Sequence, residues 1–191
     1  MKSLLFVTAI MSMIAGPTLA GDWKLDSTAS KIAFASIKND YVGEVHTFKE
    51  LSGSVSDEGV ADIAIDLSSV ETLIDIRNER MAEHVFKMLP SARLTAQLDL
   101  SEAQKVAVGD MMTMDVEAVL SLVGTEVDVY TEMVMVRLSE DRVMVMSNDM
   151  AFLETDTAGI DEGIDKLQEL AGLDMIARAV PVTVRFVFDA S

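Results

Sequence analysis

The chain has 191 residues, no cysteine and a formal net charge of −17, and 50% of its residues are hydrophobic. This length suits one domain. The lack of cysteine excludes disulfides, thiolate metal sites and lipid attachment through an N-terminal cysteine, so the hydrophobic core must supply the stability. The acidic charge argues against nucleic acid and anionic lipid as partners.

Residues 1–20 have the layout of a secretory signal peptide. A lysine precedes the apolar run Leu4–Ala15, and the segment closes with small residues at Thr18–Ala20. The apolar run is too short to span a bilayer. We therefore expect cleavage before Gly21, a mature domain at residues 21–191 that lies outside the cytoplasm, and no integral membrane segment.

The mature chain opens with segments in which apolar and polar residues alternate, as they do in strands with one buried face. These predicted strands cover Trp23–Leu25, Lys31–Ile37, Thr47–Ser56 and Ala61–Val70. Turn-forming residues separate them at Asp26–Ser30, Asn39–Asp40 and Asp57–Gly59. His46 falls between two of the predicted strands.

Two segments show helical spacing instead. Asn78–Met88 repeats apolar residues at this spacing, with Asp75 or Asn78 as its cap and Leu89–Pro90 as its end. A second helix has an acidic first turn and stops at Gly172. Its apolar face comprises Ile160, Ile164, Leu167, Leu170 and Ala171. We expect the first helix to lie across an opening of the sheet and the second to form a pole or lid.

Strand alternation dominates the rest of the chain. The predicted strands are Leu94–Leu100, Thr113–Leu122, Glu126–Leu138, Arg142–Met150 and Val182–Phe188. Within Glu126–Leu138, Met133 and Met135 alternate with the equally apolar Val134 and Val136, so the pattern leaves open which face is buried. The sequence predicts a mainly β fold, a barrel or sandwich of about eight strands with two short helices.

Three motifs follow one another along the chain. They are Trp23-Lys24-Leu25-Asp26, Ile76-Arg77-Asn78-Glu79-Arg80 leading to Phe86 and Pro90, and Gly163–Leu173 followed by Val180-Pro181-Val182. Together, their order and spacing resemble the YceI-like family across residues 22–189. The usual Arg-Asp-x-His pattern of that family stands here as Arg77-Asn78-Glu79-Arg80.

This resemblance implies a closed antiparallel, lipocalin-like barrel in the periplasm. Its elongated apolar cavity would bind a long-chain isoprenoid, such as a polyprenyl quinone or polyprenyl phosphate, or another amphiphilic lipid, with no cofactor beyond the lipid. A methionine-rich wall fits such a cavity because the flexible thioether side chain adapts to irregular apolar shapes. We expect the lining to include Phe34, Phe48, Phe86, Met114, Val116, Leu120, Met133, Met135, Phe152 and Phe186.

The headgroup of such a lipid is expected at the start of the first helix. Arg77 and Asn78 are the predicted headgroup residues, because cationic and amide donors there add to the field of the helix N-terminus. An alternative is that Arg77 only pairs with a surface acid, Glu79 or Asp75.

We expect no enzymatic activity, because the sequence does not supply a positioned catalytic set. It contains no Gly-x-Ser-x-Gly elbow, phosphate loop or dinucleotide fingerprint. Neither His46 nor His84 has a visible triad partner. The acidic residues between Asp156 and Asp165 do not follow the order of a calcium loop.

Two further functions remain open at this level. Met112-x-Met114, Met133-x-Met135 and Met144-x-Met146 each place two thioethers on one strand face, and soft sulfur ligands suit Cu(I) in an extracytoplasmic protein. A stress-related interaction module with an empty barrel is the other alternative. The sequence is also compatible with a homodimer.

Overall fold

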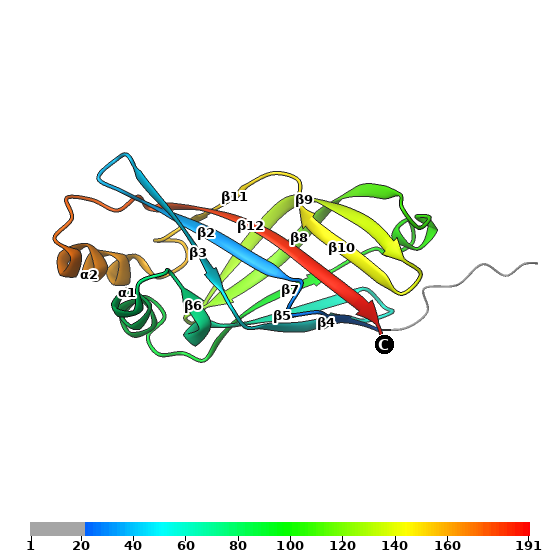
Figure 1. The fold of residues 1–191 in the computed structure, drawn as a ribbon, viewed down its shortest axis with the longest axis horizontal. Helices are drawn as coiled ribbons and strands as arrows, with labels where there is room; N and C mark the ends of the chain where they lie inside the picture. Colours follow the sequence, from blue (N-terminus) through cyan, green and yellow to red (C-terminus); the bar gives the residue numbers. More distant parts are fainter. Residues whose placement is uncertain (1–21) are drawn as a thin grey trace, which may run out of the picture.

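The computed structural model describes residues 22–191, so the predicted signal peptide lies outside the described residues (Figure 1). The strands are β1 Trp23–Leu25, β2 Lys31–Lys38, β3 Val42–Phe48, β4 Leu51–Val55, β5 Val60–Asp66, β6 Val70–Glu71, β7 Ser91–Gln97, β8 Met111–Leu122, β9 Thr125–Ser139, β10 Arg142–Ser147, β11 Ala151–Glu154 and β12 Ala179–Ala190. The helices are α1 Asp75–Arg80 and α2 Asp161–Ala171, with short helical turns at η1 Leu67–Ser69, η2 Met81–Val85 and η3 Ala103–Lys105.

Eight of the strands form a closed antiparallel barrel in the order β1-β4-β5-β7-β8-β9-β10-β12. The ring closes because β12 pairs back onto β1, with Trp23 opposite Ala190 and Leu25 opposite Phe188. The predicted mainly β, lipocalin-like barrel is confirmed.

The first half of β12 extends the barrel beyond this ring. It pairs with β11 on one flank and with β2 on the other, and β2 continues the sheet through β3 to β6. The extension lies at the end of the molecule that holds α1 and α2, away from the C-terminus (Figure 1). The wall is therefore longest where the helices cover it.

The meander β8-β9-β10 has the three strands that its alternation predicts, although β10 ends at Ser147 and not at Met150. Val123 and Gly124 turn the chain with φ values of 46° and 88°, which fits the two-residue hairpin turn that matches sheet twist. Met133 and Met135 are each 5% exposed and lie on the inner face. The sequence left open which of the two alternating sets faces the interior. In the structure Met133 and Met135 face inward, and Val134 and Val136 lie on the outer face.

The predicted strand Thr47–Ser56 is wrong. The structure has two strands there, β3 ending at Phe48 and β4 beginning at Leu51. Phe48 and Leu51 both face the interior although they are an odd number of residues apart, which one continuous strand cannot allow. As a second correction, His46 lies within β3 and not between strands.

The first helix begins earlier than predicted, at Asp75, and neither predicted residue caps it. Its N-cap is Ile74, which makes no side-chain cap hydrogen bond. The helix then loosens into the π-helical turn η2, where the Phe86 N–H donates to the Met81 carbonyl at 3.0 Å. Met88 has a φ of 55° and is 73% exposed, so it lies beyond the helix and outside its buried face.

The second helix has the acidic first turn and the end that were predicted, although Leu170 of its predicted apolar face is 36% exposed. Gly172 ends α2 in the left-handed conformation, and the Leu173 N–H donates back to the Gln168 carbonyl at 3.1 Å. Gly163 packs against η2 so closely that a Cβ there would lie 2.5 Å from the His84 carbonyl oxygen. The two helical segments therefore contact backbone to backbone and cover one end of the barrel.

Neither α1 nor α2, nor any other helix within residues 22–191, has the length and apolar character that crossing a membrane requires.

Candidate ligand-binding cavity

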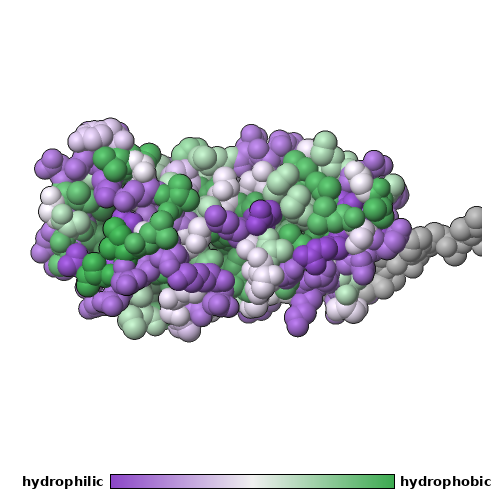
Figure 2. All heavy atoms as spheres, in the orientation of Figure 1, coloured by the Kyte–Doolittle hydropathy of each residue, from purple (hydrophilic) through white to green (hydrophobic). Residues whose placement is uncertain are grey.

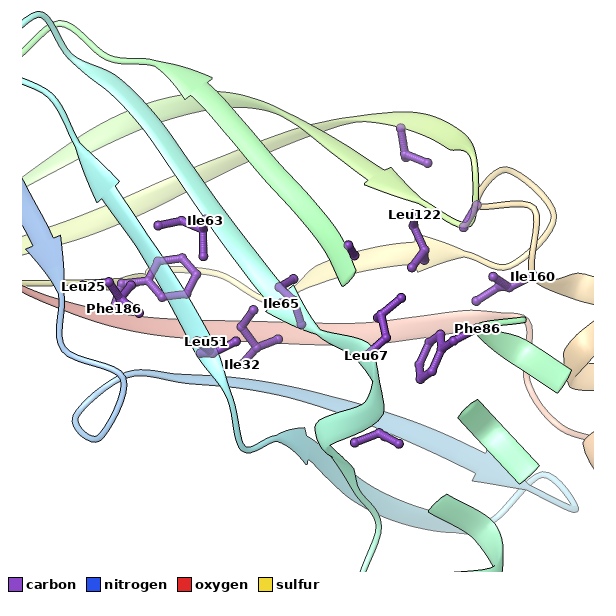
Figure 3. Close-up of a cluster of buried hydrophobic side chains, with 14 of the residues drawn as sticks. Leu25, Ile32, Leu51, Ile63, Ile65, Leu67, Phe86, Leu122, Ile160 and Phe186 are labelled. Atoms are coloured by element: carbon purple, nitrogen blue, oxygen red, sulfur yellow. The ribbon is translucent and has the colours of Figure 1, made fainter. Parts of the chain in front are cut away.

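An apolar cavity of about 910 Å³ extends along the inside of the barrel. Its wall collects the inward side chains of nearly every strand, and it reaches from Ala103 of η3 to Ile76 of α1 and Leu173 beyond α2. Figure 3 shows part of this wall, with Ile63 and Ile65 of β5 on one side and Ile32 and Phe186 on another. The volume is at the upper end of the range of small-molecule sites.

All ten predicted lining residues lie on the wall of this cavity. Phe34, Phe48 and Phe86 form a chain of ring contacts, with centroids 5.4 Å and 5.8 Å apart along it. Phe152, on β11, differs from the others in its burial, because it is 65% exposed. Contact of these residues with a ligand stays a prediction.

The inner faces of β2 and β3 change from apolar to charged along their length. Ile32 and Phe34 lie toward the barrel ring, and Ser36 and Lys38 follow on the same face of β2 toward the hairpin. On β3 the matching residues run from Phe48 through His46 to Glu44, with Ser36 directly opposite Glu44. Polar groups thus gather at the hairpin end of these two strands.

A cluster of three charged residues lies at this end. The Glu44 Oε2 atom accepts from Lys38 Nζ at 2.7 Å and from Arg77 Nη1 at 2.6 Å. The Lys38 hydrogen bond, followed by that of Arg77, lowers the pKa of Glu44 below its usual value despite partial burial. Arg77 Nη2 donates to the Thr72 carbonyl at 2.6 Å. The cluster joins α1 to the β2–β3 hairpin.

The two predicted headgroup residues therefore differ in position. Arg77 lies on the cavity wall and pairs with Glu44, not with Glu79 or Asp75. Asn78 does not line the cavity. Its amide oxygen instead accepts hydrogen bonds from the Thr72 N–H at 2.8 Å and from the Thr72 hydroxyl at 2.6 Å. Asn78 holds the segment that leads into α1.

His46 is a wall residue that sequence reasoning missed. It is 2% exposed, its Nε2 lies 2.9 Å from Ser36 Oγ, and its ring contacts Phe34 at a centroid distance of 5.3 Å. Burial, with the nearby charge of Arg77, lowers its pKa to about 4, so the imidazole is neutral near neutral pH. The available signal was the shared parity of Glu44, His46 and Phe48 after the Asn39–Asp40 turn.

Ser36 and His46 do not amount to a hydrolytic triad. An orienting acid would have to accept from the Nδ1 atom of His46. Within residues 22–191, His46 Nδ1 and Arg77 Nε are the two buried side-chain atoms with no hydrogen-bond partner. Glu44, the carboxylate on the same strand face, is engaged by Lys38 and Arg77. The low pKa of His46 also makes its imidazole a weak base.

The methionines of the copper hypothesis do not all lie on the same face of the barrel wall. Met133 and Met135 face inward, and Met135 is paired with Val145 across the sheet. Met144 and Met146 alternate with Val143 and Val145, so they point outward. These two pairs therefore cannot share one metal ion. Among the described residues, no group of three or more His, Asp or Glu side chains is placed to hold a metal ion.

The outer surface is mixed in character. Figure 2 shows hydrophilic side chains over much of the visible face, with hydrophobic groups between them, including some at the end that holds α1 and α2. Exposed apolar residues there include Leu73, Ile74 and Ile76, and the last two also line the cavity. The polar end of the cavity therefore lies beside an apolar stretch of surface.

The solved structures to which the chain is similar include the following two. One is a polyisoprenoid binding domain from Saccharophagus degradans implicated in plant cell wall breakdown: it is 37% identical, the match covers 88% of this chain and 98% of that one, and the TM-score is 0.86. The other is BcnA from Burkholderia cenocepacia, at 17% identity, with 85% and 98% of the two chains covered and a TM-score of 0.67, which shows a common fold alone. No family model and no curated protein matches the chain.

Proposed function

Because the chain belongs to the YceI-like family of polyisoprenoid-binding domains, we propose that it binds a long-chain isoprenoid lipid in the barrel cavity without catalysis. In this proposal the protein acts in the periplasm after removal of residues 1–20, where it carries or stores the lipid. The ligand is a polyprenyl chain with a polar end, of the quinone or phosphate kind.

The observation that carries the proposal is the long apolar cavity of about 910 Å³. Burial of a hydrocarbon chain contributes about 0.8 kcal/mol per CH₂ group. Association costs on the order of 4–15 kcal/mol in lost freedom of motion, so several buried isoprene units can offset that cost without a strong polar contact. Affinity then comes from the apolar wall, and orientation from the few polar groups.

The direction of the lipid follows from the polarity of the wall. The aromatic contacts of Phe34, Phe48 and Phe86 favour hydrocarbon, whereas Lys38, Glu44 and Arg77 lie at the hairpin end. In the proposed complex the chain lies along the barrel and the polar end lies beside Arg77. Arg77 is thus the headgroup residue that the geometry supports.

The test is to identify what the protein binds in its native compartment. The full chain is expressed with its own signal sequence, purified from the periplasm and extracted with organic solvent, and the extract is analysed by mass spectrometry. We expect one long-chain isoprenoid per protein. An extract without stoichiometric lipid, from a protein that also fails to take up an apolar fluorescent probe, would favour the empty interaction module.

A further inference from the structure

We propose that the barrel wall has a side opening between β9 and β11, and that the hydrocarbon chain of the ligand enters and leaves the cavity through it. The strip between the two strands, bordered by residues 127–131 and 150–154, is termed the side seam. This inference rests on the proposed lipid-binding function and deepens it, because it assigns the route by which the lipid is exchanged.

The first observation is that two neighbouring strands of the wall are not hydrogen-bonded to each other. β9 pairs with β8 from its first residue, but on its other flank it pairs with β10 only from Met133 onward. β11 pairs with β12 alone. Within residues 22–191, no strand therefore pairs with the first half of β9 on the flank that faces β11.

The second observation is that the cavity reaches the outer surface at the side seam. In the paired half of β9, the inward Met133 and Met135 line the cavity, whereas the outward Val134 and Val136 do not. In the unpaired half, all of residues 127–131 line it, so both faces of the strand border the same space. The same holds for residues 150–154. The cavity touches both faces of these two strands because it passes between them.

The outer rim of the side seam is largely apolar. Tyr130, Met150 and Phe152 line the cavity, and each is nevertheless more than half exposed. Asp128 and Glu154 are the two charged residues of the border. A hydrocarbon chain that crosses here meets mainly apolar side chains.

The side seam has a defined end on each side. Toward β10 it is closed by Asn148, whose N–H donates to the Glu132 carbonyl at 3.0 Å and whose side-chain amide donates to the Glu132 carboxylate. Toward the β8–β9 turn it is closed by Gly159, where a Cβ would lie 2.5 Å from Thr125 Oγ1. Between these contacts, the seam can widen without breaking a hydrogen bond of the strand ladder, so its opening costs less than separation of paired strands.

The alternative route is the opening at the α1 end of the barrel. Lys38, Glu44 and Arg77 form their charged cluster there. A hydrocarbon chain that threads through this end must pass groups whose desolvation is costly. The side seam avoids that cost and lets the chain move in sideways.

The test is to lock the side seam, and the absence of native cysteine makes this selective. The β9–β10 register places Ser147 opposite Met133, and its continuation places Phe152 opposite Asp128, both on the outer face. Asp128→Cys/Phe152→Cys is joined by a short bismaleimide. The control is Ser121→Cys/Glu126→Cys, an exposed, directly opposite pair that links β9 to its paired neighbour β8 and also removes one carboxylate.

The readout is the exchange of retinol, an isoprenoid alcohol, between phosphatidylcholine vesicles and delipidated protein. Energy transfer from Trp23 reports its arrival, because Trp23 is the single tryptophan of the chain and lines the cavity. We expect the lock to slow uptake and release alike, by about tenfold or more, with the dissociation constant unchanged. The lock closes the route and leaves the bound state as it was. The linked control should exchange as wild type does.

A second pair of variants needs no linker. Phe152→Glu places a carboxylate on the rim that the chain must pass, so uptake should be several-fold slower than in wild type. Tyr41→Glu is its control, since Tyr41 is an exposed aromatic residue that does not line the cavity.

The outcomes separate this inference from the proposed function. Unchanged exchange rates in the locked protein overturn the side seam as the route and place entry at the α1 end, with lipid binding intact. Weaker binding at an unchanged uptake rate also overturns it, because the seam is then part of the binding site and not the route to it. A wild-type protein that takes up neither retinol nor a long-chain polyprenol contradicts the proposed function itself.

Discussion

The surroundings of the His46 side chain determine its protonation state. Phe34 packs on the ring, Ser36 faces Nε2, and the charges of Arg77, Lys38 and Glu44 lie around it. Burial is the largest cause of the lowered pKa, because removing water destabilises the imidazolium. The residue is thus held neutral in the folded protein over a pH range in which it is protonated in the unfolded chain.

This difference predicts a pH-dependent stability. The folded-state pKa of about 4 is below the ordinary 6.5, so the contribution of His46 is fully present above about pH 6.5 and is lost as the pH falls toward 4. From about pH 7 to about pH 5 we expect wild type to lose roughly 2 kcal/mol of unfolding free energy through this group. Urea denaturation across that range measures it.

The comparison variant is His46→Phe, which should lack this loss. Carboxylates with lowered pKa values, such as Glu44 and Asp62, lose their contribution only below about pH 4, so they do not obscure the window. Stability curves for wild type and His46→Phe that stay parallel between pH 7 and pH 5 would show that His46 is protonated in the folded state.

At the scale of elements, the contact between α2 and η2 determines how one end of the barrel is covered. Gly163 allows the contact, because any Cβ would meet the backbone of His84 and Val85. Backbone atoms cannot move aside as a flexible side chain can. The π-helical turn and the glycine therefore act together as one packing unit.

Gly163→Ala should destabilise the protein by roughly 1–3 kcal/mol, the usual range for overpacking in a close contact. Gly43→Ala is the matched control, since a Cβ there meets nothing within 4 Å and the backbone has no positive φ. Urea midpoints for the two variants test this. Equal midpoints would mean that α2 shifts away from η2 at little cost.

At the scale of the whole molecule, the barrel is closed but not filled. Side chains from β5, β8, β9 and β12 face one another across a cavity of about 910 Å³ instead of interdigitating. A space of that size can be removed by one large side chain without altering strand pairing. This makes occupancy of the cavity separable from the stability of the fold.

Val116→Trp should lower lipid loading at least tenfold, because the indole enters the cavity from the inner face of β8. Glu117→Trp, on the exposed face of the same strand, is the control and should load lipid as wild type does. Lipid per protein is measured by mass spectrometry after solvent extraction. Unchanged loading in Val116→Trp, with the barrel still folded, would place the ligand outside this part of the cavity.

The elements that the sequence predicted well are those whose signals are local. The hairpin of β8 and β9 alternates inside and outside residues and turns at Gly124, and α2 has its apolar face and its stop at Gly172. The spacing of apolar residues along a strand or helix, and a glycine at a left-handed position, involve only a few neighbouring residues. Both can therefore be recognised without knowledge of the rest of the molecule. Their order also carried the family resemblance, which the structural comparison supports.

The arrangement of the site depends on contacts between residues that are far apart in the sequence, and local sequence patterns do not predict such contacts. Arg77 meets Glu44 across 33 positions, and the break between Phe48 and Leu51 follows from the path of the chain around the barrel. The burial of His46 depends on its contacts with Phe34 and Ser36 of the neighbouring strand β2. The sequence by itself determined the strand pattern and the inward apolar set; only the tertiary structure decided that this set surrounds a hollow space and where its polar end lies. The reason is that alternation records which side of a strand avoids water, and a packed core and a lipid-sized cavity satisfy that requirement equally.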